Sequence, residues 1–314
     1  GRGKEYEMTS DKAIMDILQD IDVGEILYDE PMSLHTSLAV GGKADALITI
    51  GHENQLERVV KRLKEKQINI FSAGNLTNVI VKDGGFRGAI LLMTGLKKID
   101  CCYAESGDVF IDAQAGAPLA GVVSRSLTEE ITGFEFCSGI PGSVGGAVWM
   151  NAGAYGREMK DVIESVDILD ADGVKKTLKR DDITFRYRKA CFAPATIVLG
   201  ARFKLAKGER SKIKARISEI LQWRREKHPL EYPSAGSVFK NPPGQPAGRI
   251  IEEMGLKGMT AGGAQISPKH ANFIVNRGNA TAADILTLIH VVQSKARKEK
   301  NIDLETEVLI IGED

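Results

Sequence analysis

The segment from Gly139 to Gly156, GIPGSVGGAVWMNAGAYG, restricts the possible fold more than any other part of the chain. It holds six glycines in eighteen residues, but its Ile, Val and Trp side chains make it too apolar for a flexible linker. We therefore expect it to pack inside the protein. Its glycines either let the backbone approach a flat or charged ligand closely or let one backbone pack on another. These glycines are Gly139, Gly142, Gly145 and Gly146.

Length and charge limit the class of protein. The chain has 314 residues, enough for two or three domains. Its 42 Lys and Arg residues balance its 42 Asp and Glu residues, which argues against nucleic acid or an anionic membrane as the main partner. The sequence shows neither an apolar run of membrane-spanning length nor a signal-peptide pattern, and its start, GRGKEYEMTS, is polar. We expect a soluble, cytoplasmic protein.

The cysteines indicate neither a metal site nor a disulfide framework. Cys101, Cys102, Cys137 and Cys191 lack the paired spacing with histidines that zinc requires. The five histidines form no constellation. We expect reduced thiols and no metal.

Apolar periodicity predicts an α+β fold. It indicates helices after Ser10, over residues 52–67, after Pro118, over 209–228 and after Thr281, where Asp284 completes a capping box. Short β-branched runs predict strands between them, including a hairpin that turns at Asp172-Gly173. We place domain boundaries so that residues 1–34 are an N-terminal extension with a helix, 35–207 one domain of two lobes, and 208–314 a smaller C-terminal domain.

The loop within SAGNLTNVIVKDGG, residues 72–85, is a candidate phosphate-binding turn. Gly74, Thr77 and Asn78 fall between two apolar runs, so exposed backbone amides, a hydroxyl and a side-chain amide could surround a phosphate. An ordinary connection between strands is the alternative. The dinucleotide fingerprint G-x-G-x-x-G after a strand is missing, which argues against a Rossmann fold.

Three further stretches carry candidate polar groups. In FRYRKA, strand alternation would put Tyr187 and Arg188 on opposite faces, so one of them could point inward to a carboxylate, or both could belong to a solvated basic edge. Glu305 and Glu307 would share one strand face, suited to acid–base work or to an ion pair with the Lys-rich helix before them. Ser237 in PSAGSVFKNP could simply end a strand, but its Gly-Ser context outside G-x-S-x-G disfavours a serine hydrolase.

Seven stretches together resemble the UDP-N-acetylenolpyruvoylglucosamine reductase (UDP-N-acetylmuramate dehydrogenase) family, in that family's order. They are HTSLAVGGKAD, GNLTNVIVKDGGFRG, GIPGSVGGAVWMNAGAYG, FRYRKACF, PLEYPSAGSVFKNP, GGAQISPKHANFIVN and LETEVLIIG. The resemblance implies an FAD-binding region of the vanillyl-alcohol-oxidase type, made of two α+β lobes and followed by a smaller α+β substrate domain. The spacing of Tyr232 and Ser237 resembles the branch that lacks an extra substrate-covering loop.

The resemblance also implies a reaction and a set of residues. NADPH would reduce FAD, the flavin would pass hydride to the enolpyruvyl group of UDP-N-acetylglucosamine enolpyruvate, Ser237 would donate a proton, and Arg188 and Glu307 would stabilise the enolate. Glu305 matches no catalytic position. The implied substrate contacts are Tyr187, Lys227, Tyr232, Lys240 and Asn241, and the implied FAD contacts are Gly74, Asn75, Leu76, Thr77, Asn78, Gly139, Ile140, Pro141, Gly142, Ser143, Gly145, Gly146, Asn151, Ala152 and Gly153.

One position departs from the family's pattern. The phosphate turn of the family more often reads G-x-G-S-N, whereas this chain has Leu76 at the second glycine. A β-carbon there disfavours a left-handed backbone, so we expect altered contacts at Leu76. We also expect a monomer whose partners are the two nucleotide substrates.

Overall fold

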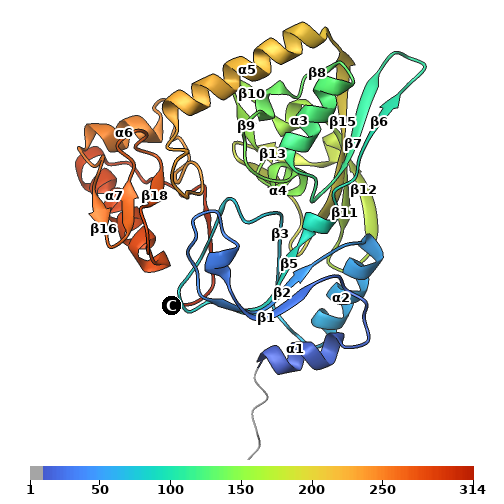
Figure 1. The fold of residues 1–314 in the computed structure, drawn as a ribbon, viewed down its shortest axis with the longest axis horizontal. Coiled ribbons are helices and arrows are strands. Elements are labelled where there is room, and N and C mark those ends of the chain that lie inside the picture. Colours follow the sequence, from blue (N-terminus) through green and yellow to red (C-terminus); the bar gives the residue numbers. More distant parts are fainter. Residues whose placement is uncertain (1–9) are drawn as a thin grey trace, which may run out of the picture.

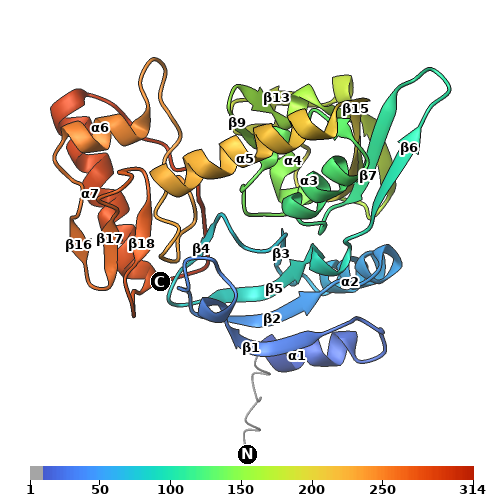
Figure 2. The same cartoon turned by 45° about the horizontal axis from the view of Figure 1, so that its top comes forward.

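The computed structural model describes residues 10–314, and the polar start of the chain, residues 1–9, lies outside them. The described chain forms two lobes and a C-terminal domain, drawn in Figure 1 in blue to teal, in green to yellow, and in orange to red. Helix α5 (Arg210–Lys227) runs from the second lobe to the C-terminal domain, as the turned view in Figure 2 shows. The predicted α+β class is confirmed.

The first lobe is built on a four-stranded sheet of order β1-β2-β5-β3. Strands β2, β5 and β3 run parallel, and β1 pairs antiparallel at the edge. The strands are β1 (Ile26–Pro31), β2 (Lys43–Thr49), β3 (Ile70–Ala73) and β5 (Phe86–Leu92), and the helices are α1 (Ser10–Leu18), α2 (Glu53–Glu65), η1 (Met32–Leu34) and η2 (Met93–Gly95).

The parallel strands of this lobe are buried on both faces. In β2, Ala46 and Ile48 pack in one core with α1 and α2, whereas Leu47 lies in a second core on the opposite face. Successive side chains of a strand point to opposite sides, so a strand covered on both sides becomes a continuous apolar run. The helices predicted after Ser10 and over 52–67 are confirmed, whereas β1 was not foreseen.

The second lobe contains a larger antiparallel sheet of order β12-β11-β15-β7-β6, with β8 paired to β15. The predicted hairpin at Asp172-Gly173 joins β11 to β12. The elements are β6 (Ile99–Tyr103), β7 (Val109–Gln114), α3 (Leu119–Thr128), β8 (Ile131–Thr132), η3 (Glu135–Cys137), α4 (Val144–Trp149), β9 (Gly153–Ala154), β10 (Arg157–Glu158), η4 (Met159–Asp161), β11 (Ile163–Leu169), β12 (Lys175–Lys179), η5 (Arg180–Asp182), β13 (Thr184–Arg186), β14 (Lys189–Cys191) and β15 (Ile197–Lys207).

The glycine-rich segment is packed in the core of this lobe, as predicted. Val144 and Val148 of the short helix α4 are fully buried. A β-carbon at Gly145 would come within 2.8 Å of the Ala115 β-carbon, so this glycine permits close packing of two backbones. The helix itself was not predicted, because two of its six residues are glycines, which favour helices weakly.

The C-terminal domain packs helices against a small antiparallel sheet. Its elements are α6 (Ala247–Glu253), α7 (Ala282–Lys300), β16 (Thr260–Ala261), β17 (Ala264–Ile266) and β18 (Ile274–Asn276). The predicted capping box is present: the Thr281 side chain accepts a hydrogen bond from Asp284 N, and Asp284 bonds Thr281 N in return. Helix α7 ends at Lys300 and is followed by Asn301, which adopts the left-handed conformation common at helix ends.

The end of the chain returns to the first lobe. Strand β19 (Leu309–Ile311) pairs in parallel with β4 (Val79–Val81), which directly follows the candidate phosphate turn. The red end of the ribbon in Figure 1 accordingly lies beside the blue lobe. This pairing brings the segment that contains Glu307 next to residues 74–78.

Candidate active site

A cavity of about 640 Å³ is lined by residues of both lobes, the last turn of α5 and the C-terminal domain. The loop 74–78, the glycine-rich segment and the residues around Ser237 form much of its wall. The three predicted catalytic residues, Ser237, Arg188 and Glu307, all line it, although they come from distant parts of the chain. This cavity is therefore the candidate active site.

The Ser237 hydroxyl is available to a ligand. It lines the cavity, and it has no hydrogen-bond partner within residues 10–314. Gly236 before it has φ +72°, which favours glycine. After it, Val238 N donates to Asn272 O at 2.8 Å and Val238 O accepts from Glu307 N at 2.7 Å. The backbone next to Ser237 is therefore hydrogen-bonded to the segment that contains Glu307.

Asn272 holds the Ser237 segment from the other side. Its side chain is buried and pairs with both backbone groups of Phe239, accepting from N at 3.0 Å and donating to O at 2.9 Å. The amide thus replaces a strand neighbour, and removing it would leave two buried backbone groups unpaired. Sequence reasoning assigned Asn272 no role.

Arg188 and Glu307 form an ion pair inside the cavity, with 3.4 Å between Nε and Oε2. The predicted strand alternation of Tyr187 and Arg188 is wrong, because both residues form the turn between β13 and β14, and Arg188 has φ +53°. Burial raises the pKa of Glu307 above its usual value, while the nearby Arg188 opposes that shift. Burial thus favours the protonated form of this carboxyl group, which can donate a hydrogen bond, while the ion pair with Arg188 favours the ionised form.

The expected common face of Glu305 and Glu307 is also wrong. Strand β19 begins only at Leu309, and the backbone bends at residues 307 and 308 where both amides approach Val238 O. Glu305 is 73% exposed and pairs with Lys240, not with the Lys-rich helix, whereas Glu307 is 15% exposed and pairs with Arg188. Only Glu307 faces the cavity.

The loop 74–78 joins β3 to β4 and lines the cavity along its whole length. Contrary to expectation, Leu76 adopts the left-handed backbone, with φ +55°. Its side chain is 3% exposed in an apolar core, and its carbonyl accepts a hydrogen bond from Ser37 N at 3.2 Å. Burying a leucine stabilises by about 1.5–3 kcal/mol, which offsets a left-handed strain of about 1–2 kcal/mol.

This loop and the glycine-rich segment fit the diphosphate of FAD. The Ser143 hydroxyl is buried, lines the cavity and has no partner in the described part of the chain. A β-carbon on Gly74 would lie only 1.9 Å from Ser143 Oγ, so glycine at residue 74 lets the two segments meet with the Ser143 hydroxyl between them. An unpaired buried donor beside exposed loop amides is the arrangement that binds a phosphate.

Most of the predicted FAD contacts line the cavity, but two do not. Asn151 is fully buried, and its amide donates to Arg186 O and accepts from Lys160 N, both at 3.0 Å. It therefore supports the hairpin that contains Arg188. Gly139 also lies outside the lining, and Asn78 lines the cavity but donates to Glu307 O at 3.1 Å. The predicted contacts that line the cavity are Gly74, Asn75, Leu76, Thr77, Asn78, Ile140, Pro141, Gly142, Ser143, Gly145, Gly146, Ala152 and Gly153.

Of the predicted substrate contacts, only Lys227 lines the cavity. Asn241 accepts from Ala247 N at 2.9 Å and so caps α6, and its own N lies 3.4 Å from the Tyr187 hydroxyl. Tyr232 stacks under Arg277, and Lys240 pairs with Glu305. These four side chains have protein partners outside the cavity lining.

The structure adds lining residues that the sequence did not reveal. Thr196 has a buried hydroxyl without a partner among residues 10–314. Arg224 and His228 line the cavity from the end of α5, where the sequence shows only a charged helix. No sequence motif marks these two residues, so their place in the cavity wall becomes visible only in the three-dimensional structure.

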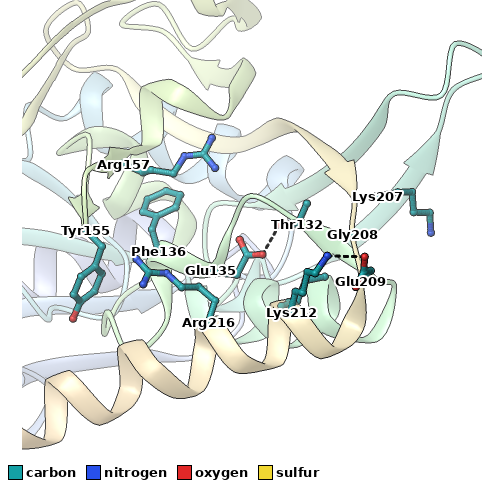
Figure 3. A pocket seen from close by; sticks show the side chains of 11 residues that line it. Thr132, Glu135, Phe136, Tyr155, Arg157, Lys207, Gly208, Glu209, Lys212 and Arg216 are labelled. Carbon is teal, nitrogen blue, oxygen red and sulfur yellow. Dashed lines mark hydrogen bonds and ion pairs between the residues drawn. The ribbon is translucent and has the colours of Figure 1, made fainter.

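A second cavity of about 670 Å³ lies between α5 and the second lobe (Figure 3). Its polar side chains already have protein partners: Glu135 bonds Thr132, and Lys212 pairs with Glu209. None of the predicted catalytic residues lines it. Within residues 10–314 no acidic, His or Cys cluster could hold a metal ion, and no helix is long and apolar enough to span a membrane.

Two family models match the chain. Residues 44–179 match an FAD binding domain, and residues 228–311 match the C-terminal domain of UDP-N-acetylenolpyruvoylglucosamine reductase. The first match covers the phosphate turn and the glycine-rich segment, and the second covers Ser237 and Glu307.

Whole-chain relatives agree with these models. A UDP-N-acetylenolpyruvoylglucosamine reductase of Syntrophus aciditrophicus is 47% identical over 93% of each chain, and one of Clostridium kluyveri is 46% identical over 94% of this chain and 95% of the relative. The crystal structure of the Thermus caldophilus reductase superposes with a TM-score of 0.76 at 34% identity, covering 91% of this chain and 98% of that one. The chain therefore belongs to the UDP-N-acetylenolpyruvoylglucosamine reductase family and is an FAD-containing oxidoreductase.

Proposed function

We propose that this enzyme uses NADPH to reduce the enolpyruvyl group of UDP-N-acetylglucosamine enolpyruvate to UDP-N-acetylmuramate, a peptidoglycan precursor. One observation carries the proposal: a serine hydroxyl without a partner in the described chain shares a cavity with a half-buried arginine–glutamate pair. Family membership supports the substrate class, and the match to an FAD binding domain supports the cofactor.

The reaction needs a hydride and a proton on neighbouring carbons. FAD, once reduced by NADPH, would supply the hydride to the terminal methylene of the substrate. The electron pair of the double bond moves to the carbon beside the substrate carboxylate, where it forms an enolate. Ser237 Oγ donates its proton to that carbon and regains one from water. The double bond is thereby reduced, with one hydride and one proton consumed.

Serine suits this role better than the histidine of the same cavity. Burial lowers the pKa of His228 to about 4, so this side chain is not a protonated acid near neutral pH. A hydroxyl keeps its proton until a strongly basic carbanion forms beside it. We therefore assign Ser237 as the proton donor.

Arg188 and Glu307 would stabilise the enolate. The guanidinium of Arg188 neutralises charge on the substrate carboxylate, and a protonated Glu307 donates a hydrogen bond to the enolate oxygen. Burial raises the pKa of Glu307, which favours its protonated form more than in an exposed carboxyl group. Each such preorganised contact lowers the barrier by about 3 kcal/mol.

Several finer assignments belong to the same proposal. We infer that NADPH and the sugar nucleotide use one cleft in turn, and that the enzyme is a cytoplasmic monomer in which the four free cysteines stay reduced. We retain the boundary between 35–207 and 208–314, which the two family matches support by falling on either side of it; the expected boundary at residue 34 is wrong, because β1 pairs with β2 and so belongs to the first lobe.

Product analysis tests the proposed reaction. With NADPH and the enolpyruvyl sugar, the product should gain two hydrogen atoms, and in deuterated water the hydrogen added to the carbon beside the carboxylate should be deuterium. Oxygen consumption without a reduced sugar would indicate an oxidase. Bound flavin that NADPH leaves oxidised would indicate a binding protein without this activity.

A further inference from the structure

The charge of the cavity lining is unbalanced. Its cations are Arg188, Arg224 and Lys227, and Glu307 is its only acid in the described chain. Even when Glu307 is ionised and neutralises Arg188, two positive charges remain, and a protonated Glu307 leaves three. A cavity with this excess attracts an anionic ligand.

Arg224 is the half-buried member of this unpaired set, whereas Lys227 is exposed. Its Nε is buried without a hydrogen-bond partner, and its guanidinium makes no ion pair with residues 10–314. The acidic groups that act on it are the phenol of Tyr155 and the thiol of Cys137, neither of which is a carboxylate. Burial also raises the pKa of Cys137 well above its usual value, so the thiol stays neutral. A partly buried arginine without a counterion is unfavourable until an anion binds.

Gly139 explains how α5 can bring Arg224 to this position. A β-carbon at residue 139 would lie 2.6 Å from Arg224 Cδ and 3.3 Å from its Nε, and Gly139 itself has φ +72°. The aliphatic stem of Arg224 therefore lies directly against the start of the glycine-rich segment. Gly139 does not line the cavity, but the absence of a side chain at this position leaves room for Arg224 and for Leu221.

The spacing of the two free cations fits a diphosphate. Arg224 and Lys227 are three residues apart on α5, so they lie on the same side of the helix, and both line the cavity. A planar guanidinium binds two phosphate oxygens at once, and a lysine adds a mobile charge. We propose that Arg224, seated by Gly139, binds the diphosphate group of a nucleotide ligand. If Arg224 binds the diphosphate of the sugar nucleotide, the inference rests on the proposed function. If it binds the diphosphate of FAD, the inference rests only on FAD being the cofactor.

Binding measurements on Arg224→Ala test the assignment. Titration of apoprotein with FAD, and of holoenzyme with UDP, separates the two possible sources of the diphosphate. Loss of a charge-assisted contact should weaken one of these affinities about 10- to 100-fold. Arg225→Ala is the matched control, because Arg225 is the next residue, is exposed and carries the same charge. Unchanged affinity for both ligands, or equal loss in the control, overturns the proposal.

A double-mutant cycle tests the role of Gly139. Gly139→Ala should weaken the same ligand as Arg224→Ala, and in the Arg224→Ala background it should weaken that ligand no further. Additive effects would contradict the coupling, even if each variant binds poorly. Since UDP and FAD affinities are measured without turnover, these results are independent of whether the enolpyruvyl sugar is the substrate.

Discussion

Replacing Ser237 by alanine should separate the two halves of the catalytic cycle. The hydroxyl has no partner in the described protein, so its removal breaks no protein hydrogen bond and should change the free energy of unfolding by less than about 0.5 kcal/mol. Proton donation by a positioned group contributes about 10²- to 10⁴-fold in rate. The whole loss should therefore fall on the step that consumes the proton.

Anaerobic stopped-flow absorbance measures both halves. Reduction of the bound flavin by NADPH should remain nearly normal in Ser237→Ala, while reoxidation by the enolpyruvyl sugar slows by two to four orders of magnitude. Ser234→Ala is a suitable control, because Ser234 lies in the same segment but outside the cavity lining. An equal decrease in both half-reactions would refute the assignment of Ser237 as proton donor.

Other substitutions test the remaining parts of the site. Glu307→Gln should slow flavin reoxidation more than Glu305→Gln does, since only Glu307 faces the cavity; equal rates would contradict this distinction. Burial raises the pKa of Glu307 above 4.5, so the protonated form stabilises the fold at low pH and that contribution is lost as pH rises through the folded pKa. The melting temperature of Glu307→Gln should thus rise relative to that of the wild type as the pH is raised above 4.5. Gly74→Ala should weaken FAD retention, because its β-carbon would lie 1.9 Å from Ser143 Oγ and force that hydroxyl to rotate away from the site; normal flavin content would contradict the proposed phosphate site. Asn272→Ala should lower the free energy of unfolding by about 1–3 kcal/mol, and an unchanged denaturant midpoint would show that its amide is dispensable.

Amphipathic helices of this chain could be predicted from sequence because the apolar residues that form one buried face recur at helical spacing. The apolar face of α2, with Leu56, Val59 and Leu63, is buried as predicted. The capping box of α7 and the turn at Gly173 depend on neighbouring residues alone. Such local signals do not require knowledge of the rest of the fold.

Elements that depend on distant partners could not be predicted in this way. Tyr187 and Arg188 resemble strand residues, but they form a turn that Asn151 supports through Arg186 O. Glu305 and Glu307 point to different sides because the backbone bends at residues 307 and 308, where both amides approach Val238 O. Neither contact leaves a periodic trace in the sequence.

Backbone strain was misjudged for a related reason. Leu76 was expected to avoid the left-handed region, yet the core around its side chain holds it there. Propensity describes a residue in isolation, whereas burial adds a tertiary energy of similar size. The unpaired Arg224 was missed because the absence of a partner is visible only in three dimensions.

An anaerobic absorbance trace tests the central claim most directly. Purified protein should show bound oxidised flavin, lose that absorbance on addition of NADPH, and regain it when UDP-N-acetylglucosamine enolpyruvate is added without oxygen. If the flavin absorbance returns only when air is admitted, the enolpyruvyl sugar is not the electron acceptor, and the catalytic roles of Ser237, Arg188 and Glu307 are contradicted.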